Sequence, residues 1–276
     1  MTPVKIMING LPGNMAATIA RHALKDPRFQ LMHQSLTGPE IEAPAHAVES
    51  ASFELIRPDR RDRTIRDLKT QEGPFLSIDF THPSAVNVNA EFYCACALPF
   101  VMGTTGGDRR KLEDTVKASS ISAVIAPNMA KQIVGFQAMM DFAAQTFPGL
   151  FRHYTLQIRE SHQKGKADTS GTAKAMIHYF NALGIPCSEA DIFQERDPEN
   201  QRRQWGIPEE HLAGHGWHTY ALDSSDGTVH FEFRHNVNGR DIYAEGTLDA
   251  AAFLHEKVAA RSKGQVFTMI DVLKGI

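Results

Sequence analysis

Near its start the chain reads VKIMINGLPGNMA over residues 4–16. The part before the first glycine is a short apolar run, which is typical of a buried parallel strand. Gly10 allows a tight turn after that strand, and Gly13 lets the backbone approach a pyrophosphate at the N-terminus of the following helix. Pro12 and Ala16 stand where a complete dinucleotide-binding motif has two more glycines. Taken alone, the segment is equally consistent with an ordinary strand-to-helix turn.

Strand, turn and helix patterns alternate through roughly the first 130 residues. Apolar residues occur at helical spacing from Met15 to Leu24, directly after the Gly-rich turn. The further strand candidates are Phe29–Ser35, Phe75–Phe80, Phe100–Met102 and Ile121–Ala126. This alternation predicts a doubly wound α/β domain whose loops gather at the strand ends.

The pattern changes later in the chain, where strand-like segments follow one another without helices between them. These segments are Tyr154–Arg159, Trp217–Tyr220, Thr228–Arg234 and Arg240–Thr247, with turns at Ser225-Asp226-Gly227 and Asn238-Gly239. They predict a second α/β domain built on a mainly antiparallel, mixed sheet. The last stretch, Ala250 to Arg261, is expected to form a helix that packs back on the first domain.

The composition is that of an ordinary globular protein. The 276 residues are enough for two domains, with 42% hydrophobic and 22% charged residues. The formal net charge of -3 suggests neither nucleic-acid nor membrane binding. No run of about 18 apolar residues occurs, so a membrane span is not expected.

The three cysteines are Cys94, Cys96 and Cys187, and the first two are too close together for an ordinary disulfide. They are expected to be reduced thiols of the core in a reducing compartment. The first strand candidate begins at Val4, which leaves no room for a signal or transit peptide in front of it. We therefore expect a cytoplasmic protein, or a plastid protein if a transit peptide has been removed.

A second Gly-rich turn, Gly103-Thr104-Thr105-Gly106, follows the strand candidate Phe100–Met102. Its small residues leave room for a nicotinamide ring and offer backbone groups to the amide of that ring. An ordinary turn has the same composition, but two Gly-rich strand ends in one α/β domain are more informative than either alone.

The most informative segment for chemistry is ESHQKGKADTSGTA, residues 160–173. It precedes a helical stretch, and Ser170 is a suitable N-cap, so the next two residues would expose free backbone N–H groups. His162 and Lys166 lie just upstream, so that a proton donor and a fixed cation could converge on an anion at this helix start. Reduction of a carboxylated imine or enamine needs that combination. A polar surface loop is the alternative interpretation.

The same segment resembles the signature of the dihydrodipicolinate reductases, also called 4-hydroxy-tetrahydrodipicolinate reductases. Most bacterial members show the pattern His-His-x-x-Lys-x-Asp-x-Pro-Ser-Gly-Thr-Ala. The chain keeps this pattern at His162, Lys166, Asp168, Ser170, Gly171, Thr172 and Ala173. It departs at Gln163, which replaces the second histidine, and at Thr169, which replaces the usual x-Pro and makes the segment one residue shorter. In this form it is similar to the plant-type branch of the family.

Further matches occur in the family's order along most of the chain. They are Gly10-x-x-Gly13-x-Met15, Asp79-Phe80-Thr81-His82-Pro83, Gly103-Thr104-Thr105-Gly106, Ala126-Pro127-Asn128-Met129, and Arg234-His235-Asn236-Val237 through Arg240. The segment at Gly10 resembles the family's cofactor loop, the one at Asp79 a strand end, and the one at Gly103 the nicotinamide loop. The segment at Ala126 resembles the hinge into the second domain. The last one resembles a His-x-x-x-x-Arg stretch whose Arg holds a substrate carboxylate.

The resemblance implies a Rossmann-like dinucleotide-binding domain at residues 1–128, completed by 249–276. It implies a substrate-binding and oligomerisation domain at residues 129–248. The implied reaction passes a hydride from NADPH or NADH to C4 of a small cyclic dicarboxylate. Its product is tetrahydrodipicolinate, in lysine and diaminopimelate biosynthesis, and water is lost on the enzyme or before binding.

The resemblance also implies roles for particular residues. His162 is expected to be the general acid/base and Lys166 a second proton donor. Ser170, Gly171 and Thr172 are expected to bind one carboxylate of the substrate, and Arg240 the other. The expected cofactor-binding residues are Gly10, Gly13, Asn14, Met15, Ser35, Thr37, Phe80, Thr81, Gly103, Thr104, Thr105, Pro127, Asn128 and Met129. No metal is expected.

Cofactor preference depends on the end of the second strand, where NAD-binding domains place a carboxylate on the ribose. Here Phe29–Ser35 runs into a turn with no carboxylate before Glu40, and no Arg or Lys stands at this point. The hydroxyls of Ser35 and Thr37 could donate to a 2′-phosphate, and the charged stretch from Arg57 could supply a cation. We therefore predict that NADPH is preferred by a modest factor and that both cofactors are used.

Several strands in a row leave an open sheet to cover, and the family covers it by association, so a homodimer or homotetramer is expected. Two other functions stay open. One is a different small-substrate dehydrogenase on the same architecture, such as an aspartate or amino-acid dehydrogenase, although the segment from Lys166 to Thr172 disfavours it. The other is a non-catalytic NADP-binding sensor.

Overall fold

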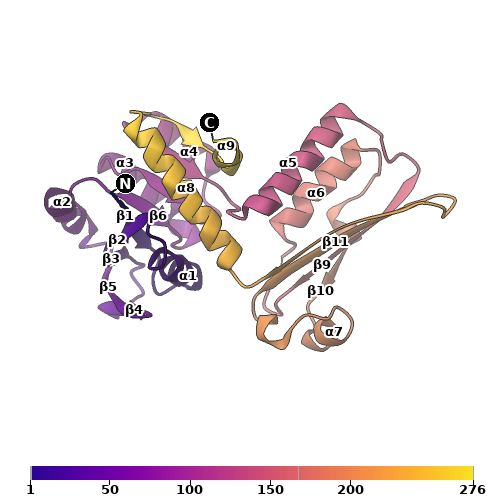
Figure 1. Ribbon diagram of the computed structural model, residues 1–276, viewed down its shortest axis with the longest axis horizontal. Coiled ribbons are helices and arrows are strands. Elements are labelled where there is room, and N and C mark those ends of the chain that lie inside the picture. The colour runs from indigo at the N-terminus through magenta and orange to yellow at the C-terminus, as the bar shows by residue number, and fades with distance from the viewer. Residues whose placement is uncertain (1, 167, 276) are drawn as a thin grey trace. The chain divides into compact units, whose positions relative to one another are not determined.

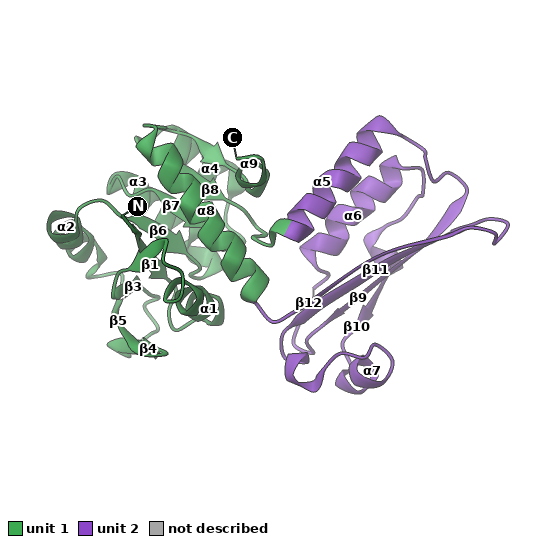
Figure 2. Cartoon of the chain, in the orientation of Figure 1, with its two compact units in different colours: residues 1–131, 241–276 green, residues 132–240 purple. Residues whose placement is uncertain are grey.

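The computed structural model describes residues 2–166 and 168–275, and Ala167 of the 160–173 segment lies outside them. The chain divides into two compact units (Figure 2). The first unit comprises Met1–Lys131 and Asp241–Ile276, and the second comprises Gln132–Arg240. The predicted ranges were 1–128 with 249–276 for the first domain and 129–248 for the second. The main difference is that residues 241–248 belong to the first unit.

The first unit is built on a parallel sheet in the order β13-β8-β7-β6-β1-β2. Its strands are β1 (Val4–Asn9), β2 (Phe29–Leu31), β6 (Leu76–Asp79), β7 (Phe100–Met102), β8 (Ala123–Ile125) and β13 (Val266–Phe267). The central strands are buried because helices cover both faces, which explains their continuous apolar runs. The predicted Rossmann-like architecture is confirmed.

The helices of this unit are α1 (Asn14–Ala23), α2 (Arg61–Glu72), α3 (Val86–Ala95), α4 (Arg109–Lys117), α8 (Asp241–Ala259) and α9 (Met269–Lys274), with a short 3₁₀ turn at Pro83–Ala85. Helices α1 and α8 pack together on one face of the sheet, and α2 to α4 cover the other (Figure 1). The charged stretch Arg57–Arg66 runs into α2, a mostly solvent-exposed helix that buries Ile65 and Leu68.

The predicted second strand, Phe29–Ser35, is wrong as a single element. The structure has β2, which pairs with β1, and a separate β3 (Gln34–Leu36), which joins β5 (Ala51–Ile56) and β4 (Ala45–Val48) in a small sheet of order β3-β5-β4. Backbone hydrogen bonds change partner at this point, since Met32 N donates to Ile6 O and the His33 carbonyl accepts from Glu54 N. A run of apolar and polar residues does not show which partner each residue takes.

The second unit carries a mixed sheet in the order β10-β9-β11-β12. Its strands are β9 (Tyr154–His162), β10 (Ile192–Glu195), β11 (His215–Ser224) and β12 (His230–Asn238), and only the β9–β10 pair is parallel. Two helices, α5 (Lys131–Thr146) and α6 (Gly171–Ala182), pack on the sheet through a core that includes Phe180 and Tyr220. A short α7 (Pro198–Arg203) follows β10. The predicted second α/β domain with a mainly antiparallel sheet is confirmed.

The predicted strand Arg240–Thr247 is wrong, because α8 begins at Asp241. Ala244, Leu248 and Ala251 are buried at helical spacing, and the predicted turn at Asn238-Gly239 is the end of β12 rather than a hairpin. Within this helix Gly246 packs closely on the backbone of Met129: a Cβ at this position would lie 1.8 Å from the carbonyl oxygen of Met129.

Within the described residues, the helices are all too short or too polar to span a membrane. The three cysteines are free thiols, each partly buried, as expected from their number and spacing.

Candidate functional site

The turn between β1 and α1 requires glycine at two positions. Gly10 has a φ of +108°, and a Cβ there would lie 2.2 Å from the carbonyl oxygen of Phe80, just after β6. A Cβ on Gly13 would lie 2.7 Å from the carbonyl oxygen of Gly10. The two glycines therefore present backbone without side chains before Asn14 and Met15, the first residues of α1. The N–H groups of these two residues have no partners inside the helix. This geometry suits a pyrophosphate.

Asp79 organises the loops at the end of the parallel sheet. Its side chain is fully buried, and Oδ1 accepts hydrogen bonds from Thr81 N (3.1 Å), Thr81 Oγ1 (2.8 Å) and Thr104 Oγ1 (2.9 Å). Oδ2 accepts from Asn89 Nδ2 (3.0 Å) and Tyr93 Oη (2.7 Å). One carboxylate thus fixes the loops after β6 and β7 and the helix α3. Sequence analysis named Asp79 in the strand-end motif but gave it no role, although a lone carboxylate ending an apolar strand is the signal for such a role.

The predicted nicotinamide loop packs against an aromatic ring. A Cβ on Gly103 would lie 2.1 Å from Phe80 Cζ, so only glycine leaves space for that ring. Thr104 is buried and its hydroxyl is bound to Asp79, whereas Thr105 is exposed. The groups that this loop can offer a cofactor are therefore its backbone and Thr105, rather than the Thr104 hydroxyl.

Ser35 and Thr37 hold the cofactor turn in place. The Ser35 hydroxyl accepts from Leu11 N at 3.3 Å, and the Thr37 hydroxyl donates to Leu11 O at 2.8 Å. The two residues are 0% and 8% exposed. Their burial does not suit the predicted donation to a 2′-phosphate, and we propose instead that they shape the turn.

Pro127, Asn128 and Met129 lead from β8 towards α5. Asn128 Oδ1 accepts from Ala130 N at 2.9 Å, which stiffens this connection, and Pro127 is exposed. Met129 is buried, and its backbone lies against Gly246 of α8. Of the three, only Pro127 and Asn128 have surface to offer a cofactor.

A row of polar side chains crosses the sheet of the second unit. The strand register places Glu160 of β9 opposite His218 of β11, and His218 opposite His235 of β12. His162 lies two residues further along β9 on the same face, opposite Gly216. A Cβ on Gly216 would lie 3.0 Å from His162 Cε1, so the glycine makes room for the imidazole. The row lies on the sheet face that α6 covers.

His162 is held in one tautomer. Its Nδ1 donates to the carbonyl oxygen of His215 at 3.0 Å, because a carbonyl can only accept. In the neutral ring Nε2 therefore carries the lone pair; it is buried, lies 3.9 Å from Glu160 Oε2 and has no hydrogen-bond partner among the described residues. Burial, followed by the neighbouring His218, lowers the pKa of His162 to about 4. The ring is neutral at neutral pH.

Ser170 caps α6, as predicted. Its hydroxyl accepts from Ala173 N at 3.1 Å and lies 2.8 Å from His218 Nε2, while its own N–H donates to Glu160 Oε2 at 3.2 Å. Gly171 is exposed, and a Cβ built on it would meet nothing within 4 Å. Open space therefore adjoins the free N–H groups of Gly171 and Thr172 in the first turn of α6. An anion can reach them there.

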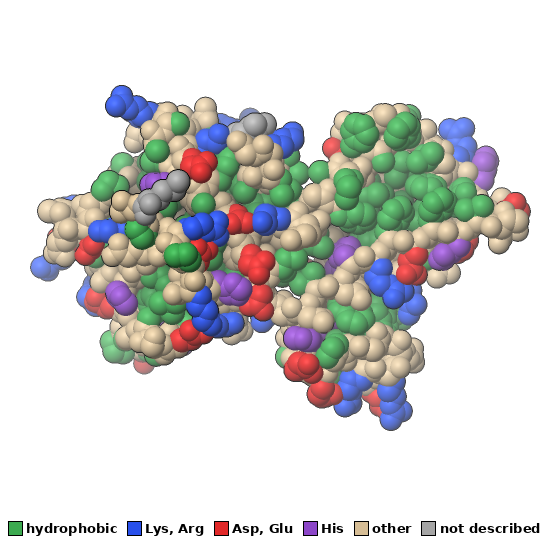
Figure 3. Space-filling model, viewed as in Figure 1, with side chains coloured by type: hydrophobic (Ala, Val, Ile, Leu, Met, Phe, Trp, Pro, Cys, Tyr) green, Lys and Arg blue, Asp and Glu red, His purple; other side chains and the backbone are tan. Residues whose placement is uncertain are grey.

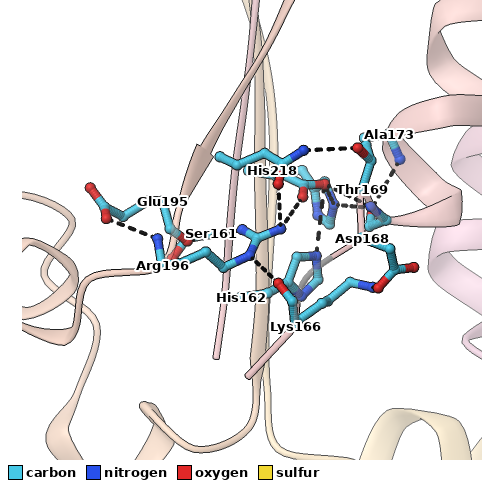
Figure 4. Close-up of polar contacts among 12 residues, drawn as sticks. Ser161, His162, Lys166, Asp168, Thr169, Ala173, Glu195, Arg196 and His218 are labelled. Carbon is cyan, nitrogen blue, oxygen red and sulfur yellow. Dashed lines mark hydrogen bonds and ion pairs between the residues drawn. The ribbon is translucent and has the colours of Figure 1, made fainter. Parts of the chain in front are cut away.

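The two predicted cations, Lys166 and Arg240, are placed differently. Lys166 Nζ donates to Asp168 Oδ1 at 2.8 Å near the surface of the β9–α6 loop, and the ammonium holds the pKa of Asp168 below its usual range (Figure 4). Arg240 packs against the backbone of Gly214, with Nη1 3.4 Å from where a Cβ would lie. Gly214 directly precedes β11, so Arg240 is at the same end of the sheet as His162.

A buried ion pair that sequence analysis missed supports this loop. Glu160 is fully buried, and its Oε1 accepts from Arg196 Nη2. Burial alone would raise the pKa of Glu160, but His218 and Arg196 lower it to about 2. Arg196 Nε also donates to the carbonyl oxygen of Lys166 at 2.9 Å, and Gln201 Nε2 donates to the carbonyl oxygen of His162 at 2.7 Å. The start and the middle of the loop are thus tied to the segment after β10.

Glu160, His162 and His218 offer ligand atoms that all lie within 4.8 Å of one another, a spacing that metal ligands can adopt. However, Glu160 already accepts from Arg196 and from Ser170 N, and His218 Nε2 lies against the Ser170 hydroxyl. Because these groups have protein partners, we propose no metal at this cluster.

The first unit offers a dinucleotide turn, and the second a neutral buried histidine beside an open helix N-terminus. Together they define a two-domain nucleotide-dependent oxidoreductase. Family models described as the N-terminus and the C-terminus of dihydrodipicolinate reductase match residues 4–129 and 133–273. The chain therefore belongs to the dihydrodipicolinate reductase family.

Individual relatives agree with this assignment. The probable 4-hydroxy-tetrahydrodipicolinate reductase 1, chloroplastic, of Oryza sativa subsp. japonica is 46% identical over 98% of this chain and 78% of its own length. The reductase 2, chloroplastic, of Arabidopsis thaliana is 43% identical over 98% of this chain and 77% of its length. A bacterial reductase from Anaeromyxobacter sp. (strain Fw109-5) is 29% identical over 98% and 97%. The resemblance to the plant-type branch is confirmed.

A solved structure shares the fold of the whole chain. The dipicolinate-bound dihydrodipicolinate reductase from Paenisporosarcina sp. TG-14 superposes with a TM-score of 0.68 at 18% identity, over 97% of this chain and 98% of that one. A diaminopimelate dehydrogenase from C. glutamicum, solved with its ligand, superposes with a TM-score of 0.54 at 10% identity, over 98% and 94%.

Proposed function

We propose that the chain reduces 4-hydroxy-tetrahydrodipicolinate to tetrahydrodipicolinate with NADPH or NADH, a step of lysine and diaminopimelate biosynthesis. The observation that carries this proposal is His162, a half-buried and neutral ring whose Nε2 is buried without a hydrogen-bond partner among the described residues, near the open N-terminus of α6. A proton donor beside an anion site is what a carboxylated cyclic imine requires. The names of the relatives and the dipicolinate-bound neighbour support the same substrate class, a small cyclic dicarboxylate.

The first unit would hold the dinucleotide. Gly10, Gly13 and the first turn of α1 fit its pyrophosphate, since a side chain on either glycine would collide with backbone. The nicotinamide would lie at the loops that carry Phe80, Thr81, Gly103, Thr104 and Thr105, which Asp79 fixes. When bound, the dihydronicotinamide would supply the hydride to C4 of the ring, after the 4-hydroxyl has left as water.

The second unit would hold the substrate. The N–H groups of Gly171 and Thr172 bind one carboxylate, and Arg240 binds the other. Ser170 positions that helix start rather than donating to the substrate, because its hydroxyl and N–H already have protein partners. Lys166 supplies a proton or a fixed charge once its ammonium leaves Asp168.

His162 must be protonated to act as an acid, and burial opposes this in the free protein. A bound dicarboxylate would raise the pKa of His162, because nearby negative charge stabilises the imidazolium. The imidazolium then protonates the reduced ring from Nε2. Nδ1 stays on the His215 carbonyl throughout, which keeps the ring oriented.

A coupled assay tests the proposed function. Purified protein should consume NADPH only when the lysine-pathway substrate is generated in the same cuvette. Consumption with aspartate-derived or other amino-acid substrates, in place of this one, would favour a different dehydrogenase on the same fold. Binding of NADPH with no turnover on any of them would favour a sensor.

Cofactor choice is expected to depend on Arg57 and Glu40. Arg57 follows β5, and the parallel register Leu36↔Ile56 places it beside Thr37, at the strand end where a 2′-phosphate would lie. The Glu40 carboxylate folds over Gly38 in the next turn. We predict NADPH preferred by a modest factor with both cofactors used. Arg57→Ala should lower kcat/KM for NADPH by roughly 10- to 100-fold, since a charge-assisted hydrogen bond contributes about 1.5–3 kcal/mol.

Measurements of kcat/KM for NADPH and for NADH at saturating substrate test this prediction of cofactor preference. Glu40→Gln should shift the preference the opposite way, towards NADPH, and Arg63→Ala on exposed α2 serves as the matched control. A clear NADH preference in the unaltered protein, or an equal loss for both cofactors in Arg57→Ala, would contradict the prediction.

We also predict association into a dimer or tetramer. Met139 and Phe142 of α5 are 65% and 64% exposed, and hydrophobic side chains gather over α5 and α6 (Figure 3). Exposed apolar surface of this kind commonly marks an interface. Light scattering at micromolar concentration should give a mass of at least two chains, and a monomer there would refute the prediction.

The cellular compartment stays a prediction. The sequence was expected to be cytoplasmic, or plastid after removal of a transit peptide. The rice and Arabidopsis relatives are named chloroplastic, which supports the plastid alternative.

A further inference from the structure

Arg196 makes contacts that differ from those of a surface cation. Its guanidinium donates through Nη2 to Glu160 Oε1, through Nε to the carbonyl oxygen of Lys166 at 2.9 Å, and through Nη1 to the carbonyl oxygen of Glu195 at 2.9 Å (Figure 4). Its side chain is 17% exposed. Arg196 thus holds the loop that leads from His162 to α6 at two points: directly in its middle, at Lys166, and through Glu160 at its end, at Ser170.

Glu160 creates an electrostatic problem for the proposed substrate. Its Oε2 lies 3.2 Å from Ser170 N and 3.9 Å from His162 Nε2, so a buried negative charge stands beside both the helix start and the acid/base. Unpaired, this carboxylate would repel a dicarboxylate and hold a proton on His162 before substrate arrives. A buried charge without a partner is also costly to the fold.

Two of the other groups that face His162 bring no charge to Glu160: burial lowers the pKa of His215 on β11 and brings that of His235 on β12 to about 3. His218 does contact the carboxylate, since its Nε2 lies 3.7 Å from Glu160 Oε2, and it lowers the pKa of Glu160 together with Arg196. Lys166 lies in the same loop but its ammonium is paired with Asp168. Among the described residues that face His162, the guanidinium of Arg196 is the cation bound to Glu160.

We propose that Arg196 is a positioning residue of the active site: by pairing with Glu160 it fixes the β9–α6 loop and cancels the buried charge, so that the site admits a dicarboxylate and His162 takes its proton only when that anion is bound. This inference rests on the proposed function for the identity of the anion. The pair itself is independent of that identity, because it exists without a ligand.

The test is a pair of substitutions that should act in opposite directions. Arg196→Met removes the cation and leaves Glu160 unpaired, so the proton affinity of His162 should rise at least about tenfold. Glu160→Gln removes the negative charge and keeps the shape, so this affinity should fall. Arg196→Lys keeps the charge, and its His162 proton affinity should stay close to that of the unaltered protein. The control is Arg202→Met, which removes an exposed arginine of α7.

The proton affinity is read by NMR titration of the His162 Cε1 proton without substrate, so its outcome does not depend on the reductase assay. Calorimetry with dipicolinate as probe should show binding weakened at least about tenfold in Arg196→Met and not weakened in Glu160→Gln. A shift in the same direction in both variants, or in neither, would overturn the proposal. If Arg196→Met does not fold, Glu160→Gln still decides: an unchanged or raised proton affinity of His162 contradicts it.

Discussion

Replacing His162 by alanine is expected to lower kcat by roughly 10²-fold or more, a typical contribution of a positioned general acid. The ring is oriented by the His215 carbonyl through Nδ1, and its Nε2 is buried and has no hydrogen-bond partner among the described residues. Lys166→Ala is expected to lower kcat to a similar extent. Steady-state kinetics at saturating substrate and cofactor measure both effects.

Matched controls separate chemistry from general damage. His230→Ala removes an exposed histidine of β12 that pairs with Asp223, and Lys164→Ala removes an exposed lysine of the same loop as Lys166. Both controls should keep near-native kcat. NADPH binding should be nearly unchanged in all variants, since the dinucleotide turn belongs to the other unit. A double variant of His162 and Lys166 with near-native kcat would refute the assigned roles.

Arg240→Ala is expected mainly to raise KM for the dicarboxylate, by roughly 10- to 100-fold, because a charge-assisted hydrogen bond contributes about 1.5–3 kcal/mol. The guanidinium lies beside Gly214 at the His162 end of the sheet, where the second substrate carboxylate would have to lie. kcat should change much less, because Arg240 binds substrate and transition state alike.

The control for Arg240 is Arg234→Ala, which removes an arginine of β12 that pairs with Glu232 at 56% exposure. Its KM should stay near the native value. An unchanged KM in Arg240→Ala, measured with substrate varied at saturating NADPH, would show that this arginine serves the packing at Gly214 rather than the substrate.

Local patterns predicted most of the architecture. The apolar run before Gly10 is β1, the turn at Gly103 follows β7, and Ser170 caps α6, because each of these features depends on residues that are neighbours in the chain. The mixed sheet was predicted from strand-like segments that include parts of β9, β11 and β12, although α6, β10 and α7 lie between β9 and β11. These features could be predicted because backbone preference and burial periodicity act over a few residues.

The errors arose where partners are distant. Phe29–Ser35 divides between two sheets. Arg240–Thr247 leads into α8, whose Gly246 packs on Met129, far away in the chain. The hydroxyls of Ser35 and Thr37 face Leu11 rather than the surface, a direction that no pattern in the strand reveals.

The sequence by itself determined the family, the two-domain architecture and the residues of the β9–α6 loop, since these are written in contiguous motifs. Only the tertiary structure decided how that loop is charged and held. Glu160 meets Arg196 across 36 residues and stands beside His218 through strand register. Asp79 binds Asn89 and Tyr93 of α3 and Thr104 of the loop after β7. Such contacts depend on how strands align and helices pack. The buried carboxylates of Glu160 and Asp79 contact residues distant in the chain, which become neighbours only in the folded protein.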